Sequence, residues 1–360
     1  MELLEYFYDR NNEIATYHQR KYSISKEDKC LLIYGSPASG KSSLALNYLM
    51  NYDPKEVLYI DFLDPKFAFR DIIKEDIEGF IDANDITVLV LDHYEHNYFE
   101  LLPKAKQLII LSDTYYNYNE TFNYLELPLL DYEEFFAFQK RGTKKQIFNH
   151  FLRQGTLPEL STQTAPKEQL FLNFIRSHFS KSEQKLLTIL AHFNTASITT
   201  HQLYTFAKER YKISKDLIYR QVKEFTNRGI IKFVHDYLNP SNKKLIFFDF
   251  ALAKYLTLTQ NFPKQFDTMI ALSLIKHHIE FKAFGLSGYL TEQQELIVPA
   301  PFESEDSFWK KAHNRFPTYK QNKIKKVYII TIASHYEFAI ENITFEALPF
   351  YEWVVINDEE

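Results

Sequence analysis

The sequence predicts an α/β fold that opens with a parallel sheet and continues into two smaller parts. Three observations support this prediction. A glycine-containing loop lies between an apolar run and a helical stretch at residues 31–49. Further apolar runs follow it at intervals typical of alternating strands and helices. Beyond residue 175, three helical stretches precede two β-like runs.

The loop at residues 35–43 reads Gly-Ser-Pro-Ala-Ser-Gly-Lys-Ser-Ser, which matches the P-loop pattern G-x-x-x-x-G-K-[ST]. The chain has only 8 glycines in 360 residues, and two of them occupy the two required positions. The alternative is a chance glycine turn before a helix, which the strand–loop–helix context disfavours.

This loop predicts a site for a nucleotide polyphosphate, because backbone N–H groups at a helix N-terminus wrap phosphate oxygens. Lys41 would reach the β- and γ-phosphates, and the Ser42 hydroxyl would hold Mg²⁺. The predicted nucleotide-binding residues are Gly35, Ser36, Pro37, Ala38, Ser39, Gly40, Lys41, Ser42 and Ser43.

Apolar runs after the loop predict the remaining strands, at residues 57–62, 86–92, 107–112 and 124–127. We expect helical stretches between the first three of these runs. Strands that are apolar throughout and alternate with helices are typical of a parallel sheet covered on both faces.

The run at residues 86–92 ends in Asp92, as in a Walker B motif. An acid at the end of a strand beside the phosphate loop can hold Mg²⁺ through water. The alternative is a cap of the following segment. The run at residues 57–62 lies between the two motifs, which fits NTPases with an extra strand there better than small kinases.

Hydrolysis also requires a group that orients the attacking water. His93 follows Asp92 at a position where many ATPases carry Glu. Glu95 and Asp61 are candidate substitutes, and Ser112 could contact the γ-phosphate. Each could instead be a cap or turn residue, so nucleotide binding is better supported than turnover.

The helical stretches at residues 183–193, 200–209 and 215–227, followed by β-like runs at 230–234 and 244–248, outline a winged helix-turn-helix. Thr199 or Thr200 would cap the second helix and Ser214 the third. In the third helix, four apolar residues are expected to face inward: Leu217, Ile218, Val222 and Phe225.

Charge in this region favours duplex DNA as a partner. Residues 201–245 hold ten Lys and Arg against four acids, in a chain whose net charge is −5. The candidate DNA contacts lie on the third helix and at the tip of the wing: Lys215, Tyr219, Arg220, Lys223, Lys243 and Lys244. A protein-interaction module with a solvated basic face is the alternative.

Several segments resemble the prokaryotic, archaeal-type AAA+ ATPases, which are related to the STAND signalling NTPases. The discriminating segments are Leu-Pro-Leu-Leu-Asp-Tyr-Glu-Glu-Phe at 127–135 and Phe-Leu-Arg-Gln-Gly-Thr-Leu-Pro-Glu at 151–159. The strand at 58–62, the strand at 108–112 and the segment at 248–256 also fit, so the resemblance covers about residues 25–260.

The resemblance implies an AAA+-type ATPase core with ATP and Mg²⁺, a winged helix, and a C-terminal α/β domain of restriction-endonuclease-like shape. Relatives often use an arginine as a trans-acting finger or sensor, for which Arg141 and Arg153 are the candidates, with surface solvation as the favoured alternative. A homo-oligomer is compatible with the resemblance. Two departures stand out: Pro37-Ala38 replaces a frequent Arg in the loop, and Asp92-His93 replaces Asp-Glu. The second departure predicts slow hydrolysis.

In the C-terminal region, strands are expected at residues 287–290, 295–299 and 326–332, the last of them central to its sheet. The nuclease-type Glu-x-Lys spacing occurs only at Glu280–Lys282, on what looks like the end of a helix. We therefore expect no nuclease activity. The acidic residues 358–360 are expected to form a solvated tail.

The sequence predicts a division into residues 1–160, 161–260 and 261–360. No apolar run is long enough for a membrane span, the first residues lack signal-peptide features, and Cys30 is the only cysteine, which together predict a cytoplasmic protein without membrane contact. A nucleotide-gated protein scaffold with little hydrolysis and no DNA binding is the alternative to a DNA-linked ATPase. An active nuclease and a small-molecule kinase are disfavoured.

Overall fold

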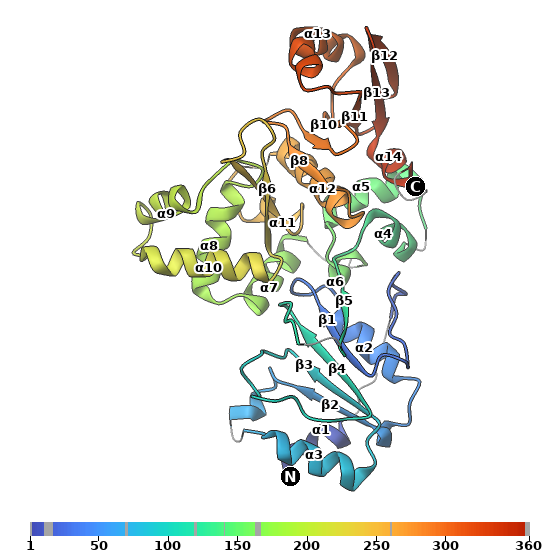
Figure 1. The fold of residues 1–360 in the computed structure, drawn as a ribbon, viewed down its shortest axis with the longest axis vertical. Coiled ribbons are helices and arrows are strands. Elements are labelled where there is room, and N and C mark those ends of the chain that lie inside the picture. Colours follow the sequence, from blue (N-terminus) through green and yellow to red (C-terminus); the bar gives the residue numbers. More distant parts are fainter. Residues whose placement is uncertain are drawn as a thin grey trace. The chain divides into compact units, whose positions relative to one another are not determined.

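The computed structural model describes residues 2–10, 17–68, 71–118, 121–139, 141–162, 167–259 and 261–356. The chain forms two compact units, drawn as ribbons in Figure 1. The first unit is Met1–Leu130 with Asn227–Gly229, and the second is Asp131–Thr226 with Ile230–Glu360. The helical stretch at 131–160 thus belongs to the second unit, and the three-part division stays a prediction. Within the described ranges, no helix is long and apolar enough to cross a membrane.

The first unit contains the predicted parallel sheet. Its strands are β1 (Cys30–Tyr34), β2 (Val57–Asp61), β3 (Val88–Asp92), β4 (Gln107–Ser112) and β5 (Asn123–Glu126). They lie in the order β2-β3-β4-β1-β5, and every pair is parallel. The carboxyl ends of β1, β3 and β4 therefore meet at one edge of the sheet, where ligands of such sheets bind.

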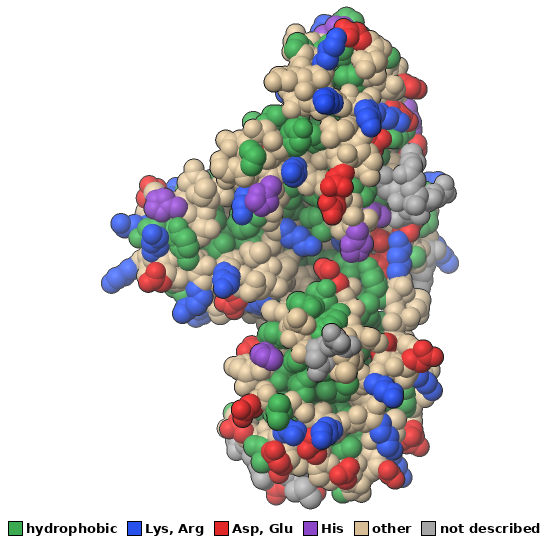
Figure 2. Space-filling view, viewed as in Figure 1, with side chains coloured by type: hydrophobic (Ala, Val, Ile, Leu, Met, Phe, Trp, Pro, Cys, Tyr) green, Lys and Arg blue, Asp and Glu red, His purple; other side chains and the backbone are tan. Residues whose placement is uncertain are grey.

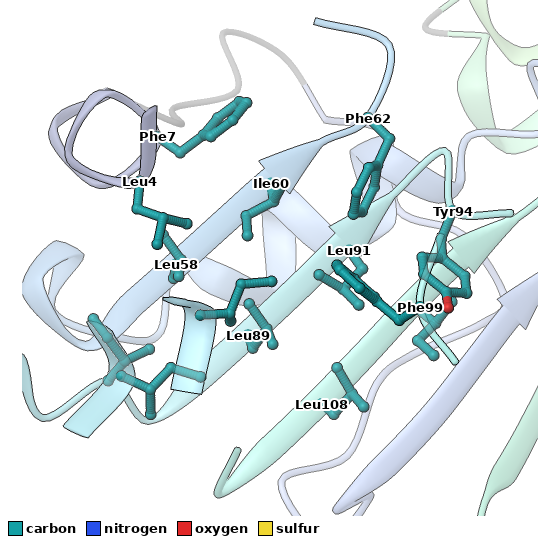
Figure 3. Close-up of a cluster of buried hydrophobic side chains, with 14 of the residues drawn as sticks. Leu4, Phe7, Leu58, Ile60, Phe62, Leu89, Leu91, Tyr94, Phe99 and Leu108 are labelled. Atoms are coloured by element: carbon teal, nitrogen blue, oxygen red, sulfur yellow. The ribbon is translucent and has the colours of Figure 1, made fainter. Parts of the chain in front are cut away.

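Helices cover both faces of this sheet. Residues of α1 (Glu2–Asp9) and α3 (Lys74–Asn84) pack on one face, and α2 (Lys41–Leu49) packs on the other. Figure 3 shows Leu4 and Phe7 of α1 above Leu58 and Ile60 of β2. Two short 3-10 turns, Pro54–Glu56 and Pro65–Ala68, flank β2.

The prediction of a helix between β3 and β4 is wrong. The described chain at residues 93–106 contains turns and bends but no helix. His93 leaves β3 with a left-handed φ of 53°, and the N–H of Tyr94 then donates to Leu111 O of β4. Tyr94 and Phe99 fill the core in place of a helix face, as Figure 3 shows.

The second unit begins with helices α4 (Tyr132–Phe138), α5 (Lys144–Gln154), α6 (Pro158–Ser161) and α7 (Lys167–His178). The three predicted helices follow as α8 (Lys181–His192), α9 (Thr200–Lys208) and α10 (Lys215–Asn227), and the two predicted strands as β6 (Ile231–His235) and β7 (Lys243–Phe247). Thr199 and Ser214 cap α9 and α10 as expected. The helices and the hairpin are present, and their assignment as a winged helix stays a prediction.

The end of the second unit is a mixed six-stranded sheet with helices. After α11 (Leu252–Tyr255) and α12 (Phe262–Lys276), the strand order is β12-β13-β11-β10-β9-β8. The elements are β8 (Phe281–Ala283), β9 (Tyr289–Thr291), β10 (Glu295–Pro299), α13 (Glu305–Gln321), β11 (Lys326–Thr331), β12 (Tyr336–Ile340), β13 (Ile343–Pro349) and α14 (Phe350–Ile356). The strand predicted at residues 326–332 is interior to the sheet, as expected.

The expected helical position of Glu280–Lys282 is wrong. The helix α12 ends at Lys276, His278 adopts a left-handed φ of 54°, and Lys282 lies on the edge strand β8. The expectation of no nuclease activity stays a prediction. The acidic tail at residues 358–360 lies outside the described residues.

A buried carboxylate joins two of the segments that carry the family resemblance. Asp249 is fully buried and accepts hydrogen bonds from Thr156 N (2.5 Å), Thr156 Oγ1 (2.7 Å), Ala251 N (2.8 Å) and Leu252 N (2.7 Å). A Cβ on Gly155 would lie well under 3.0 Å from both carboxylate oxygens. Burial raises the pKa of this carboxyl, and the four hydrogen bonds oppose that shift.

Candidate functional site

The loop between β1 and α2 has a backbone that its two glycines make possible. Gly40 precedes α2 with φ 95° and ψ 19°, in the left-handed region that glycine tolerates best. A Cβ on Gly35 would lie well under 3.0 Å from Leu127 O. The Ser39 N–H donates to Ser36 O (3.2 Å), which closes the loop into a tight turn.

The ammonium group of Lys41 lies against this loop. Its Nζ donates to Gly35 O (2.9 Å), Ser36 O (3.1 Å) and the Asp113 carboxylate (2.9 Å). Lys41 itself is buried. Burial tends to raise the pKa of Asp113, but the charge and hydrogen bond of Lys41 together with the charges of Arg228 and His93 outweigh it, so the pKa lies below its ordinary value.

The expectation that Ser112 contacts the γ-phosphate stays a prediction. The Ser112 hydroxyl is buried and accepts a hydrogen bond from Thr114 N (3.2 Å). The next residue, Asp113, is the one that reaches the P-loop lysine. The sequence signal for this contact is that an acid, Asp113, directly follows β4, the strand that pairs with β1.

The two predicted Mg²⁺ ligands, Ser42 and Asp92, share one hydrogen-bonding partner. The buried Tyr59 hydroxyl of β2 donates to Asp92 Oδ2, and the Ser42 hydroxyl also bonds to Tyr59. Burial, followed by the neighbouring Asp92 charge, raises the pKa of Tyr59 well above its usual range, so it remains a donor. Sequence reasoning did not single out Tyr59.

Asp61, Asp92 and His93 form a compact group at the ends of β2 and β3. One ligand atom from each lies within 4.8 Å of the others. The His93 ring joins the two acids: Nδ1 is 2.8 Å from Asp61 Oδ1 and 3.6 Å from Asp92 Oδ1. The His93 N–H also donates to Asp92 Oδ1 (2.8 Å).

Ionic contacts inside this group shift its pKa values. Burial tends to lower the pKa of His93, but the Asp61 hydrogen bond and the acidic charges outweigh it, so the pKa is raised. Burial tends to raise the pKa of Asp61, but the hydrogen bonds from His93 and the Leu63 N–H, together with nearby positive charge, outweigh it, so the pKa is lowered. Oxygen and imidazole ligands of this kind suit a divalent cation.

Glu95, the other predicted substitute for a catalytic acid, is not part of this group. It is exposed, and its carbonyl oxygen accepts a hydrogen bond from Tyr98 N in a turn. The arginine-finger candidates Arg141 and Arg153 are both exposed and lie in the second unit.

The predicted DNA-contacting face of α10 is exposed at Lys215, Tyr219, Arg220 and Lys223. The Lys215 ammonium lies 5.5 Å from the centre of the Tyr219 ring. On the inner face, Leu217 is half-buried, and Gln221 is buried beside the predicted apolar residues.

At the hairpin, Lys243 is exposed as expected, whereas the prediction for Lys244 is wrong. Lys244 is 3% exposed, and its Nζ pairs with Asp267 at 2.6 Å. Neighbouring residues of a strand point to opposite faces, so β7 can present only one of the two lysines outward. In the face drawn in Figure 2, acidic and basic side chains are interspersed.

No family model matches the sequence, and no curated protein matches it. A STAND protein with a tetratricopeptide repeat sensor from Pyrococcus horikoshii is similar in structure at 15% identity and TM-score 0.28, covering 69% of this chain and 43% of that one. The chain therefore spans less than half the length of that protein.

Two further solved structures are similar. The Walker-type ATPase of Pyrococcus abyssi has 11% identity and TM-score 0.43, covering 64% of this chain and 91% of that one. A chain of Drosophila ORC bound to AT-rich DNA and Cdc6 has 13% identity and TM-score 0.19, covering 61% and 82%. All three TM-scores lie below 0.5, so a functional conclusion has to rest on the site itself.

Proposed function

We propose that the first unit binds ATP with Mg²⁺ on the loop at residues 35–43. The observation that carries this proposal is the position of Lys41, whose buried ammonium group is held by two loop carbonyls and contacts an anion, the Asp113 carboxylate. A nucleotide phosphate is an anion of the kind that this lysine and the N-terminus of α2 attract. It would compete with Asp113 for Lys41.

The Mg²⁺ ion would be held by Ser42 and, through water, by Asp92. These residues fit the ion, because the Ser42 hydroxyl and the Asp92 carboxylate both bond to the Tyr59 hydroxyl and so lie close to each other. When bound, the ion would neutralise charge on the phosphate oxygens. Tyr59 would keep the Asp92 carboxylate oriented.

We expect this site to hydrolyse ATP slowly. The residue after Asp92 is His93, and Asp61, the predicted substitute acid on β2, is bonded to the His93 ring at 2.8 Å. A carboxylate engaged in this way is a weaker acceptor for a water proton than a free glutamate. Nucleotide binding is therefore better supported than nucleotide hydrolysis.

Replacing Lys41 with alanine is expected to weaken binding of ATP–Mg²⁺ by roughly 100-fold, because charge-assisted bonds to phosphate are lost. Titration with a fluorescent ATP analogue measures the dissociation constant. Lys29→Ala, which removes an exposed lysine of the same unit, is the matched control and should bind normally. Equal affinity of the Lys41→Ala variant and the wild type would overturn the proposal.

We further propose that nucleotide state controls binding of duplex DNA through α10. The supporting observation is the exposed face formed by Lys215, Tyr219, Arg220 and Lys223. Basic side chains on one helix face suit phosphate contacts. A protein partner gripped by the same region without hydrolysis is the second candidate, favoured by His93 at the position after Asp92.

The variant Arg220→Ala/Lys223→Ala is expected to weaken DNA binding and to reduce the slope of log affinity against log salt by about 2. Fluorescence anisotropy with a labelled duplex, over a salt series with and without ATP–Mg²⁺, measures both effects. The control Lys310→Ala/Lys325→Ala removes two exposed lysines elsewhere in the second unit. Wild-type protein that shows no salt-dependent DNA affinity would favour the protein partner.

A further inference from the structure

A buried arginine that precedes the first strand contacts the phosphate-binding loop. Arg20 is only 6% exposed. Its Nη1 donates to Ser39 O at 2.7 Å, and its Nη2 donates to Pro128 O at 2.8 Å. Arg20 therefore links the loop to the segment that follows β5, across separations of 19 and 108 residues in the chain.

The bond to Ser39 O controls the orientation of a peptide group inside the loop. The Ser39–Gly40 peptide is planar and trans, so its C=O and N–H point in opposite directions. With Ser39 O directed at Arg20, the Gly40 N–H points away from Arg20. Gly40 is the last glycine of the loop, whose N–H groups form the phosphate cradle.

Glycine at position 40 makes this control necessary. Its left-handed conformation is one of several that glycine adopts at little cost, so the residue does not fix the peptide orientation by itself. Arg20 supplies the missing constraint through a short, charge-assisted hydrogen bond to the preceding carbonyl. The fork geometry of a guanidinium lets the same side chain hold Pro128 O.

We propose that Arg20 is a positioning residue of the nucleotide site, which fixes the Ser39–Gly40 peptide so that the Gly40 N–H binds a nucleotide phosphate. This inference rests on the proposed nucleotide binding. The second bond of Arg20 attaches the loop to Pro128, two residues before the first unit ends at Leu130. Loop geometry and the segment leaving the unit therefore depend on one side chain.

The test compares ADP and ATP–Mg²⁺ affinities of Arg20→Ala, Arg20→Lys and wild type by isothermal titration calorimetry. Arg20→Ala is expected to weaken both nucleotides by a similar factor, roughly 10-fold to 100-fold, because the N–H groups of the loop contact the phosphates that both share. Arg20→Lys can hold only one carbonyl well and should recover part of the loss.

Addition of guanidinium chloride at low, non-denaturing concentration should restore binding in Arg20→Ala, since the free ion can occupy the position of the side chain. Sodium chloride at equal ionic strength should not. A side chain that only stabilised the fold would not give this ion-specific rescue. Arg10→Ala is the control, because Arg10 makes a partly exposed pair with Asp64 at 3.5 Å in the same unit.

A folded Arg20→Ala protein whose affinities lie within twofold of wild type would overturn the inference. If Arg20→Ala does not fold, Arg20→Lys decides: a several-fold loss is expected, and unchanged affinity overturns the inference. Wild-type protein that binds neither nucleotide would instead remove the proposed function, so the two failures are distinguishable.

Discussion

Replacing Asp249 with alanine is expected to lower the free energy of unfolding of the second unit by about 3–5 kcal/mol. The substitution leaves four donors without their acceptor in a fully buried place: Thr156 N, Thr156 Oγ1, Ala251 N and Leu252 N. A buried donor without a partner keeps its whole desolvation cost, which exceeds the gain from removing the carboxylate.

The positions of the tryptophans allow unfolding of the second unit to be measured separately. The chain has two, Trp309 and Trp353, and both belong to the second unit. Tryptophan fluorescence in a urea titration therefore reports unfolding of this unit, while nucleotide binding reports the first.

Thr156→Val is the matched control for Asp249→Ala, because it removes one of the four bonds and keeps the Thr156 N–H. Its expected cost is about 1 kcal/mol. An Asp249→Ala midpoint no lower than that of Thr156→Val would contradict the structural role assigned to this carboxylate.

The sheet of the first unit could be predicted because its signal is local. Each strand is a short apolar run. In β1, Leu31 and Ile33 pack on one covered face of the sheet and Leu32 on the other, so the strand is apolar throughout and easily recognised. The segment after β3 is an exception: a helix is expected there, but Tyr94 and Phe99 lie five positions apart, which is not the spacing of one helix face. They instead fill the core from a chain that His93 turns back toward β4.

Local patterns also predicted the loop but not the residues that complete the site. Tyr59, Asp113 and Arg20 act through contacts with residues 19 to 108 positions away in the chain. None of them stands in a motif that contains its partner. Which strands are neighbours decides such contacts, and that order emerges only from the packed sheet.

The hairpin lysines show a case where the sequence held a usable signal. Both Lys243 and Lys244 were expected at the wing tip, yet strand geometry places neighbours on opposite faces. Lys244 pairs with Asp267 of α12, and its ammonium also lies 4.4 Å from the centre of the Tyr289 ring. Its partner could not be foreseen, but one lysine of the two had to point inward.

The second large effect is expected for Gly35→Ala, which should abolish tight nucleotide binding and destabilise the first unit by roughly 2–4 kcal/mol. The new Cβ would lie well under 3.0 Å from Leu127 O, a backbone atom that cannot move aside alone. Leu127 N donates to Tyr34 O at 2.7 Å, so relief of the clash would disturb the end of the β1–β5 pair.

Hydrogen exchange of β1 and β5 peptides, followed by mass spectrometry, measures the stability of the first unit, which contains neither tryptophan. Gly79→Ala is the matched control: Gly79 lies inside α3, and its added Cβ would meet no atom within 4 Å. Because alanine forms helices better than glycine, this variant should be about 0.5–1 kcal/mol more stable and bind nucleotide normally. Faster exchange confined to Gly35→Ala would assign the effect to the clash at the loop, whereas equal behaviour of the two variants would show that the loop tolerates a side chain at residue 35.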